Sequence, residues 1–166
     1  MMKRRDLLLA GARSVVYLAG AAALSRLNGT GSAQAEAFEV TKTDAEWRGI
    51  LSSEQYAVLR EESTERPGTS PLLSEKREGL FHCAGCDLAL YSSRNKYESG
   101  TGWPSFWDSL PKAIGTRQDY SLFMARTECH CRRCGGHLGH IFDDGPPPTG
   151  LRHCINGVAL TFRATE

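Results

Sequence analysis

Two Cys-x-x-Cys motifs constrain this chain more than any other feature of its sequence. Cys83 and Cys86 form the first motif, and Cys131 and Cys134 form the second. Each motif brings two thiolates together on one tight turn, and two such turns complete the tetrahedral ligand shell that zinc prefers. The segment between them, residues 87–130, is longer than the usual zinc-ribbon spacing and must fold as a body of its own. The pattern predicts one structural zinc ion (Zn2+).

Two redox-active cysteine pairs, or two disulfides, are the alternatives to a metal site. A redox-active pair normally opens a helix, whose dipole lowers the pKa of one thiol, and neither motif precedes a helical pattern. Disulfides stay open as an alternative, because they are common in proteins that leave the cytoplasm.

Residues 1–35 have the layout of an export signal. Arg4 and Arg5 precede a weakly apolar stretch, and Ala33-Gln34-Ala35 supplies a small-x-small cleavage pattern, as in twin-arginine signals. The apolar stretch, residues 15–24, is too short for a membrane anchor, which needs about 20 residues to cross the hydrocarbon core. We therefore expect a protein exported to the bacterial periplasm, with the membrane involved only through the export machinery and with the functional domain at 36–166.

The charge of this domain differs from that of the whole chain. The full sequence has a formal net charge of +1, but residues 1–35 hold more basic than acidic side chains, so residues 36–166 are net acidic. No basic patch remains to attract nucleic acid by counterion release. With 40% hydrophobic and 23% charged residues, the composition also excludes a disordered chain.

Two short helices are predicted at the start of the domain, near residues 43–51 and 53–62. A capping-box pair opens each of them: Thr43 with Glu46, and Ser52 with Gln55. The Pro, Gly, Ser and Thr content of residues 63–74 then indicates a loop that lies over the rest of the domain.

The remainder of the chain, from Gly79 onward, is predicted to be mainly β. It shows no sustained helical periodicity, and turn signals interrupt its short apolar runs every 8 to 12 residues or so, as in small all-β domains. The clearest strand is the last one, where Val158, Leu160 and Phe162 alternate with small or polar residues.

Cys154 lies outside both metal motifs and is a candidate nucleophile. In a regular strand, Arg152, Cys154 and Asn156 would share a face with Val158 and Leu160. A neighbouring guanidinium favours the reactive thiolate, and a carboxamide can hydrogen-bond a polar substrate oxygen. A small buried core cysteine is the alternative, and a bulge at Gly157 would break the alternation.

The chain from Gly79 to Phe162 resembles the B-type peptide-methionine (R)-sulfoxide reductases. The resemblance rests on four ordered blocks: FHCAGC (81–86), YESGTGWPSF (97–106), CRRCGGHLGHIFDDGPPPTGLRHCIN (131–156) and VALTF (158–162). The segment from Trp47 to Pro67 is similar too. The resemblance implies two twisted antiparallel sheets around the zinc motifs, with short helices on the N-terminal side.

The resemblance also implies the roles of individual residues. The zinc ligands fall on Cys83, Cys86, Cys131 and Cys134, and the catalytic nucleophile falls on Cys154. The remaining pocket residues of the family fall on Trp103, His137, His140, Phe142, Arg152 and Asn156. The implied partners are oxidised proteins that bear methionine sulfoxide and a thiol reductant such as a thioredoxin-like protein, and a monomer is expected.

The residue types suit this chemistry. A sulfoxide presents an electrophilic sulfur to Cys154, and His137 and His140 are suitable proton donors to its oxygen. Trp103 and Phe142 can accept the methyl group, and the reaction leaves a sulfenic acid on the cysteine. The alternative for Trp103 is an ordinary core residue, and the alternatives for the two histidines are spare metal ligands or solvated loop residues.

The chain departs from the family pattern at two positions. Many members have a resolving cysteine where this chain has Thr101, which leaves Cys129 as the remaining candidate to resolve the sulfenic acid. A buried strand residue is the alternative for Cys129, and an external thiol can attack the sulfenic acid directly. His153 replaces the usual aromatic neighbour of Cys154, and it either tunes the pKa of that thiol or faces outward.

Two other functions fit a small β domain with zinc motifs. One is a binding module without catalysis, which has no use for a non-metal cysteine among polar neighbours. The other is a different thiol enzyme, such as a thiol-adduct lyase. Reductant consumption with an R-sulfoxide, absent with the S epimer, distinguishes the reductase from both.

Overall fold

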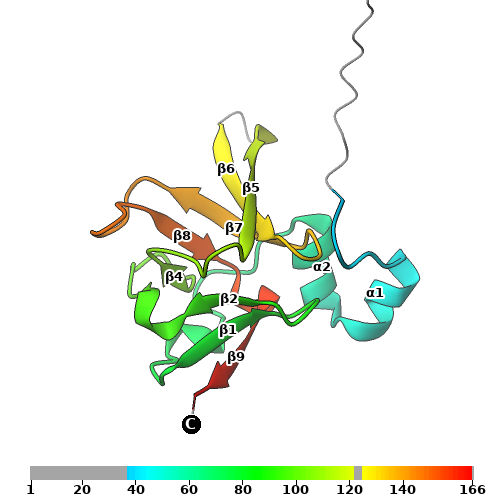
Figure 1. Ribbon diagram of the computed structural model, residues 1–166, viewed down its shortest axis with the longest axis horizontal. Helices are drawn as coiled ribbons and strands as arrows, with labels where there is room; N and C mark the ends of the chain where they lie inside the picture. Colours follow the sequence, from blue (N-terminus) through cyan, green and yellow to red (C-terminus); the bar gives the residue numbers. More distant parts are fainter. Residues whose placement is uncertain (1–36, 122–124, 166) are drawn as a thin grey trace, which may run out of the picture. The chain divides into compact units, whose positions relative to one another are not determined.

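The computed structural model describes residues 37–121 and 125–165 (Figure 1). The expected export signal, residues 1–35, lies outside the described residues. Within the described ranges, no helix has the length and hydropathy needed to cross a membrane.

Two short helices open the described part of the chain, α1 at Asp44–Ile50 and α2 at Ser53–Glu61. Both predicted capping boxes are formed. The Thr43 hydroxyl accepts the Glu46 N–H while the Glu46 carboxylate accepts the Thr43 N–H, and Ser52 and Gln55 repeat this exchange. These local hydrogen bonds satisfy N–H groups that the first turn leaves unpaired, which confirms both helices.

Among the described residues nine strands follow, and their bounds are β1 Gly79–Cys83, β2 Ala89–Ser92, β3 Lys96–Tyr97, β4 Ser105–Phe106, β5 Ile114–Asp119, β6 Arg126–Cys131, β7 His137–Phe142, β8 Arg152–Ile155 and β9 Leu160–Ala164. They form a three-stranded sheet in the order β2-β1-β9 and a six-stranded sheet in the order β3-β4-β8-β7-β6-β5. Neighbouring strands are antiparallel in both sheets. The predicted fold class, mainly β with two antiparallel sheets, is confirmed (Figure 1).

Aromatic side chains join the two sheets. Tyr91 of the smaller sheet stacks on Phe106 of the larger one with ring centroids 4.3 Å apart, and Phe81 meets the same ring edge-on at 5.0 Å. All three side chains are fully buried. Burying aromatic rings of this size supplies much of the stability of a small core, and it fixes how one sheet lies against the other.

The prediction of one continuous C-terminal strand is wrong. The chain leaves β8 after Ile155, makes a short 3-10 turn at Gly157–Ala159, and enters β9 in the other sheet. Leu160 therefore does not share a face with Cys154. A Cβ at Gly157 would lie 1.9 Å from the Ser70 hydroxyl oxygen, so the turn depends on a residue without a side chain.

Candidate active site and metal cluster

The four motif cysteines converge on one point. One ligand atom from each of them lies within 4.8 Å of the others, with Sγ–Sγ distances of 3.7 Å for Cys83–Cys134 and 3.5 Å for Cys86–Cys131. Four sulfur ligands about 2.3 Å from a central zinc stand about 3.8 Å apart, so the spacing fits a tetrahedral metal ion. All six cysteines of the chain lie in the described residues and none is in a disulfide, which sets the disulfide alternative aside.

The two motifs have the same backbone geometry. The Asp87 N–H donates to the Cys83 carbonyl at 2.8 Å, and the Gly135 N–H donates to the Cys131 carbonyl at 2.8 Å. Asp87 and Gly135 also share a left-handed conformation, with φ of 62° and 68°. This repeated turn aims both thiols of each motif at the same point, as a metal site requires.

The N-terminal helices cover the cluster. Trp47 of α1 and Leu59 of α2 are buried, and both contact the position of a Cβ on Gly85 at 3.5 and 3.6 Å. The Arg60 guanidinium donates to the Cys134 carbonyl at 3.0 Å. The metal motifs are thus part of the hydrophobic core, so a loss of structure in either motif disturbs the packing of both helices.

A separate cavity of about 150 Å³ opens beside Cys154. The residues that line it are Thr64, Trp103, Arg126, Gly139, His140, Phe142, Cys154 and Asn156. Five of the eight were predicted from the sequence as site residues. Two aromatic side chains, Trp103 and Phe142, and several polar groups are thus gathered around the Cys154 thiol.

Cys154 occupies the centre of a cross-strand row. Its partner on β7 is His140, and its partner on β4 is Ser105. Residues directly opposite in antiparallel strands have side chains on the same face, so His140 stands next to the thiol. Gly139 permits this approach of β7 to β8, because a Cβ there would lie 2.0 Å from the Cys154 carbonyl oxygen.

Burial raises the pKa of the Cys154 thiol, which is the largest of the effects on it. Contact with the Thr101 hydroxyl, at 3.9 Å, and the charge of Arg152 both oppose this rise. The predicted influence of Arg152 on the thiol therefore has the right direction, but desolvation outweighs it and the net shift favours the neutral thiol.

The acidic side chain of Asp119 forms a hydrogen bond with the imidazole of His140. The Nε2 of His140 lies 2.8 Å from the Asp119 carboxylate, which also accepts from Arg126 at 2.6 Å. Burial, the largest effect, lowers the pKa of His140, and the Asp119 hydrogen bond opposes it. Asp119 thus fixes the ring orientation and favours the protonated imidazole.

His137 is more deeply placed than His140. It does not line the cavity as described, but its ring centroid lies 5.4 Å from that of His140. Its Nδ1 lies 2.7 Å from the Glu128 carboxylate, and its buried Nε2 has no hydrogen-bond partner in the described part of the chain. The alternative that the two histidines are spare metal ligands is not needed, since four sulfurs already complete the cluster.

Arg152 is fixed by two neighbours. Its Nε and a terminal nitrogen donate to the two oxygens of Asp144 at 2.8 and 2.9 Å, and its guanidinium lies 4.4 Å from the centre of the Phe142 ring. A bidentate pair of this kind holds the guanidinium plane in place. Arg152 therefore orients the ring that forms one wall of the cavity.

Trp103 and Asn156 are both tied to the backbone of one preceding segment. The Trp103 indole donates to the Glu65 carbonyl at 3.1 Å, and the Asn156 side-chain oxygen accepts the Glu65 N–H at 2.9 Å. The Asn156 side-chain nitrogen donates to the Leu138 carbonyl at 3.0 Å. That nitrogen carries two hydrogens, of which this bond uses one.

Cys129 is not brought to Cys154. It lies on β6, separated from β8 by β7, and its side chain points to the face opposite Glu128 and His140. Its Sγ contacts the Tyr91 hydroxyl at 3.3 Å, and burial raises its pKa to about 12. This geometry matches the buried strand residue that was the alternative reading.

His153 also points away from the cavity. It is buried on the inner face of β8, where its Nδ1 lies 3.3 Å from the same Tyr91 hydroxyl and burial lowers its pKa. Of the two alternatives for His153, an outward-facing side chain is wrong, because strand alternation directs it between the sheets when Cys154 faces the cavity.

Sequence reasoning missed Asp119, Arg126 and the segment around Glu65. Asp119 and Arg126 are cross-strand partners at the end of the hairpin where β5 leads into β6, and their pairing depends on a register that no motif encodes. Glu65 lies in a segment that was predicted to be a loop and was included in the family resemblance, but no role was assigned to it.

Comparison with known proteins agrees with this geometry. The family model described as the SelR domain matches residues 51–164. A peptide methionine sulfoxide reductase MsrB of Agrobacterium fabrum is 50% identical over 125 residues, which cover 75% of this chain and 93% of the relative.

Two further relatives with the same description are more similar still in identity. The protein of Thiobacillus denitrificans is 52% identical over 126 residues, covering 75% of this chain and 96% of its own length. That of Pseudomonas putida strain W619 is 52% identical over 129 residues, covering 77% and 97%. The chain belongs to the SelR-domain family of peptide methionine sulfoxide reductases MsrB, and it is an oxidoreductase that acts on methionine sulfoxide.

Proposed function

We propose that this enzyme reduces the R epimer of methionine sulfoxide in proteins, with Cys154 as the nucleophile. The observation that carries the proposal is the placement of Cys154 directly opposite His140 in a small cavity whose walls include Trp103 and Phe142. The rings offer an apolar site for the methyl group, and the sulfur of the substrate then faces the thiol.

The first step forms a bond between the Cys154 sulfur and the sulfoxide sulfur while the oxygen takes up a proton. His140 supplies that proton, and Asp119 favours its protonated form against burial, which lowers the pKa of the ring overall. His137 supports His140, because the two rings are adjacent, and the Glu128 carboxylate holds the Nδ1 of His137. Transfer of the oxygen to Cys154 then releases methionine and leaves a cysteine sulfenic acid, so the thiol is oxidised by two electrons as the substrate is reduced.

The second step regenerates the thiol with an external reductant. Thr101 stands beside Cys154 where many relatives have a resolving cysteine, and Cys129 faces the opposite side of the sheet. A thiol of a thioredoxin-like protein or a small molecule attacks the sulfenic acid, releasing water and forming a mixed disulfide. A second thiol then releases Cys154 as the free thiol.

The ion held by the four-cysteine cluster is proposed to be structural zinc. Four thiolate ligands with tetrahedral spacing suit zinc, and no ligand position in the set is left for substrate. Residues 1–35, by their sequence layout, are proposed to direct export to the periplasm, and the domain is proposed to act as a monomer.

A single-turnover experiment tests the thiol chemistry. Enzyme freed of reductant is mixed with a peptide that contains methionine R-sulfoxide, and the products are measured by mass spectrometry with a reagent that traps sulfenic acids. We expect one methionine formed per chain and one trapped sulfenic acid, located on Cys154. Formation of a 129–154 disulfide would contradict the external-thiol step.

A further inference from the structure

We propose that Glu65 is a positioning residue that sets the geometry of the substrate cavity without touching the substrate. The inference rests on the proposed function, in which the cavity lined by Trp103 and Asn156 receives the substrate. Glu65 holds these two residues through its backbone, and its own carboxylate is anchored to the turn that follows Asn156.

The backbone of Glu65 connects two residues that line the cavity, Trp103 and Asn156. Its N–H donates to the Asn156 side-chain oxygen at 2.9 Å, and its carbonyl accepts from the Trp103 indole at 3.1 Å. The indole ring plane and the carboxamide plane therefore both depend on where the peptide groups on either side of Glu65 lie. A small displacement of this one residue changes both walls together.

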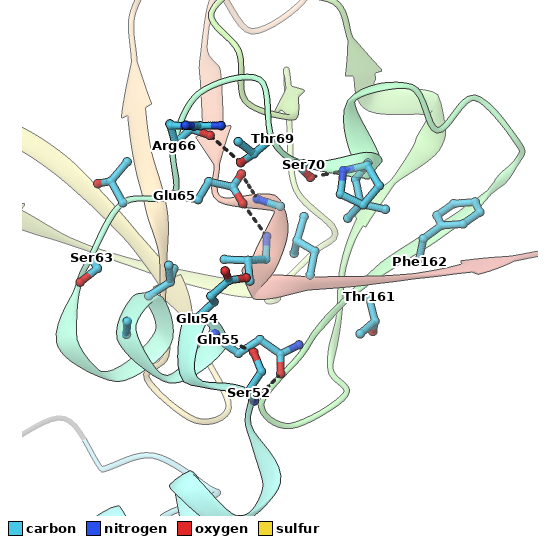
Figure 2. A pocket seen from close by; sticks show the side chains of 18 residues that line it. Ser52, Glu54, Gln55, Ser63, Glu65, Arg66, Thr69, Ser70, Thr161 and Phe162 are labelled. Carbon is cyan, nitrogen blue, oxygen red and sulfur yellow. Dashed lines mark hydrogen bonds between the residues drawn. The ribbon is translucent and has the colours of Figure 1, made fainter.

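The carboxylate of Glu65 fixes that position. Its two oxygens accept the N–H groups of Gly157 and Val158 at 2.6 and 2.9 Å, and Figure 2 shows the side chain reaching these backbone nitrogens. Hydrogen bonds to a charged acceptor are stronger than neutral ones. They occur at the turn that redirects the chain from β8 to β9, immediately after the nucleophile strand.

The carboxylate acts on the side away from Cys154. Glu65 lines a second cavity of about 890 Å³, beside α2 and β9, whereas it is not among the described residues that line the cavity at Cys154 (Figure 2). Its effect on the substrate must therefore pass through Trp103 and Asn156.

A further contact restrains the same segment. The Gly68 N–H donates to the Gly102 carbonyl at 2.8 Å, and a Cβ at Gly102 would lie only 2.8 Å from the Cβ of Pro67. Residues 65–68 thus lie directly on the loop that leads into Trp103. The hydrogen bonds of the Glu65 carboxylate and the close packing of Pro67 against Gly102 together restrain the loop that leads into Trp103.

Replacement of Glu65 by alanine removes both carboxylate bonds but leaves the backbone groups. We expect the KM for a peptide with methionine R-sulfoxide to rise about tenfold while kcat changes less than threefold, because the lost interaction affects substrate binding groups rather than the thiol. Glu65→Gln keeps one acceptor oxygen and is expected to restore part of the KM. Glu54→Ala is the matched control. Glu54 lines the same second cavity from α2, and no described hydrogen bond joins it to Trp103 or Asn156.

The indole N–H of Trp103 gives a readout that does not depend on activity. Its NMR resonance, assigned with a Trp103→Phe variant, is expected to shift and to exchange faster with solvent in Glu65→Ala, and to stay in place in Glu54→Ala. The alkylation rate of Cys154 with iodoacetamide should match the wild type in both variants, which establishes that the sheet is intact.

An unchanged indole resonance in Glu65→Ala, or a KM equal to that of Glu54→Ala, overturns the inference. If Glu65→Ala does not fold, the same comparison is made with Glu65→Gln, for which a smaller shift in the same direction is expected and no shift is the contradicting result. Wild-type protein without activity on the R-sulfoxide refutes the proposed function instead, and the indole experiment still decides whether Glu65 positions Trp103.

Discussion

His140 on β7 and Cys154 on β8 are direct cross-strand partners, so their side chains emerge side by side on one face of the six-stranded sheet. The same row continues to Glu128 on β6 and Ser105 on β4. The proposed nucleophile and the proposed proton donor are thus placed by sheet register, which is more rigid than placement by a loop. Asp119 on β5, the strand that pairs with β6, orients the imidazole of His140.

Thr101→Val tests the contact between the Thr101 hydroxyl and the thiol. The hydroxyl lowers the pKa of Cys154 against the effect of burial, so its removal should raise that pKa and reduce the thiolate fraction at neutral pH. The pH dependence of Cys154 alkylation by iodoacetamide measures this directly. Thr101→Ser keeps a hydroxyl and serves as the control; a midpoint in the valine variant at or below that of wild type would contradict the account.

Asp119→Asn tests the support of His140. Asp119 raises the pKa of His140 against burial, and an amide in its place removes that effect, so the pKa of the imidazole should fall further. Because the protonated ring donates the proton, the loss of kcat/KM with rising pH should begin at a lower pH. The measurement is a pH profile, with Asp143→Asn as control; an unmoved profile in Asp119→Asn refutes the role of this pair.

Cys129→Ala tests the external-thiol step. Cys129 faces Tyr91 on the inner side of the sheet, so multiple turnovers with a dithiol reductant should continue at close to the wild-type rate. The substitution removes one buried sulfur and is expected to lower the free energy of unfolding by about 1 kcal/mol. A variant that stops after a single turnover while remaining folded would identify Cys129 as the resolving thiol.

Metal removal tests the cluster. The cysteine motifs are buried with Trp47 and Leu59, so loss of the ion should affect the core and lower the Tm by more than about 10 °C. Metal analysis should find one zinc per chain in wild type and in Cys154→Ser, and none in Cys134→Ser. Unchanged thermal stability after chelation, with the metal shown to be gone, contradicts a structural role.

Local signals in the sequence predicted the local features of this fold. Each capping box lies within four consecutive residues, so the sequence contains all the groups that form it. The cysteine motifs were equally informative, since each turn is short and metal ligation explains why two distant turns meet.

Features that depend on distant contacts escaped prediction. The break between β8 and β9 involves the Gly157 N–H and the carboxylate of Glu65, far apart in the sequence. Burial of Cys154 is likewise a property of the assembled sheets, which is why its net pKa shift opposed the expectation drawn from Arg152 alone. Asp119 became visible as a partner of His140 only through the register of β5, β6 and β7.

The central claim is that Cys154 reduces the R epimer of peptidyl methionine sulfoxide, and one assay with three samples tests it most directly. Wild-type protein with reductant is given the R-sulfoxide peptide and, separately, the S-sulfoxide peptide, and Cys154→Ser is given the R-sulfoxide peptide. The account predicts methionine formation only from wild type with the R epimer. Equal turnover of the S epimer, or retained turnover in Cys154→Ser, would contradict it.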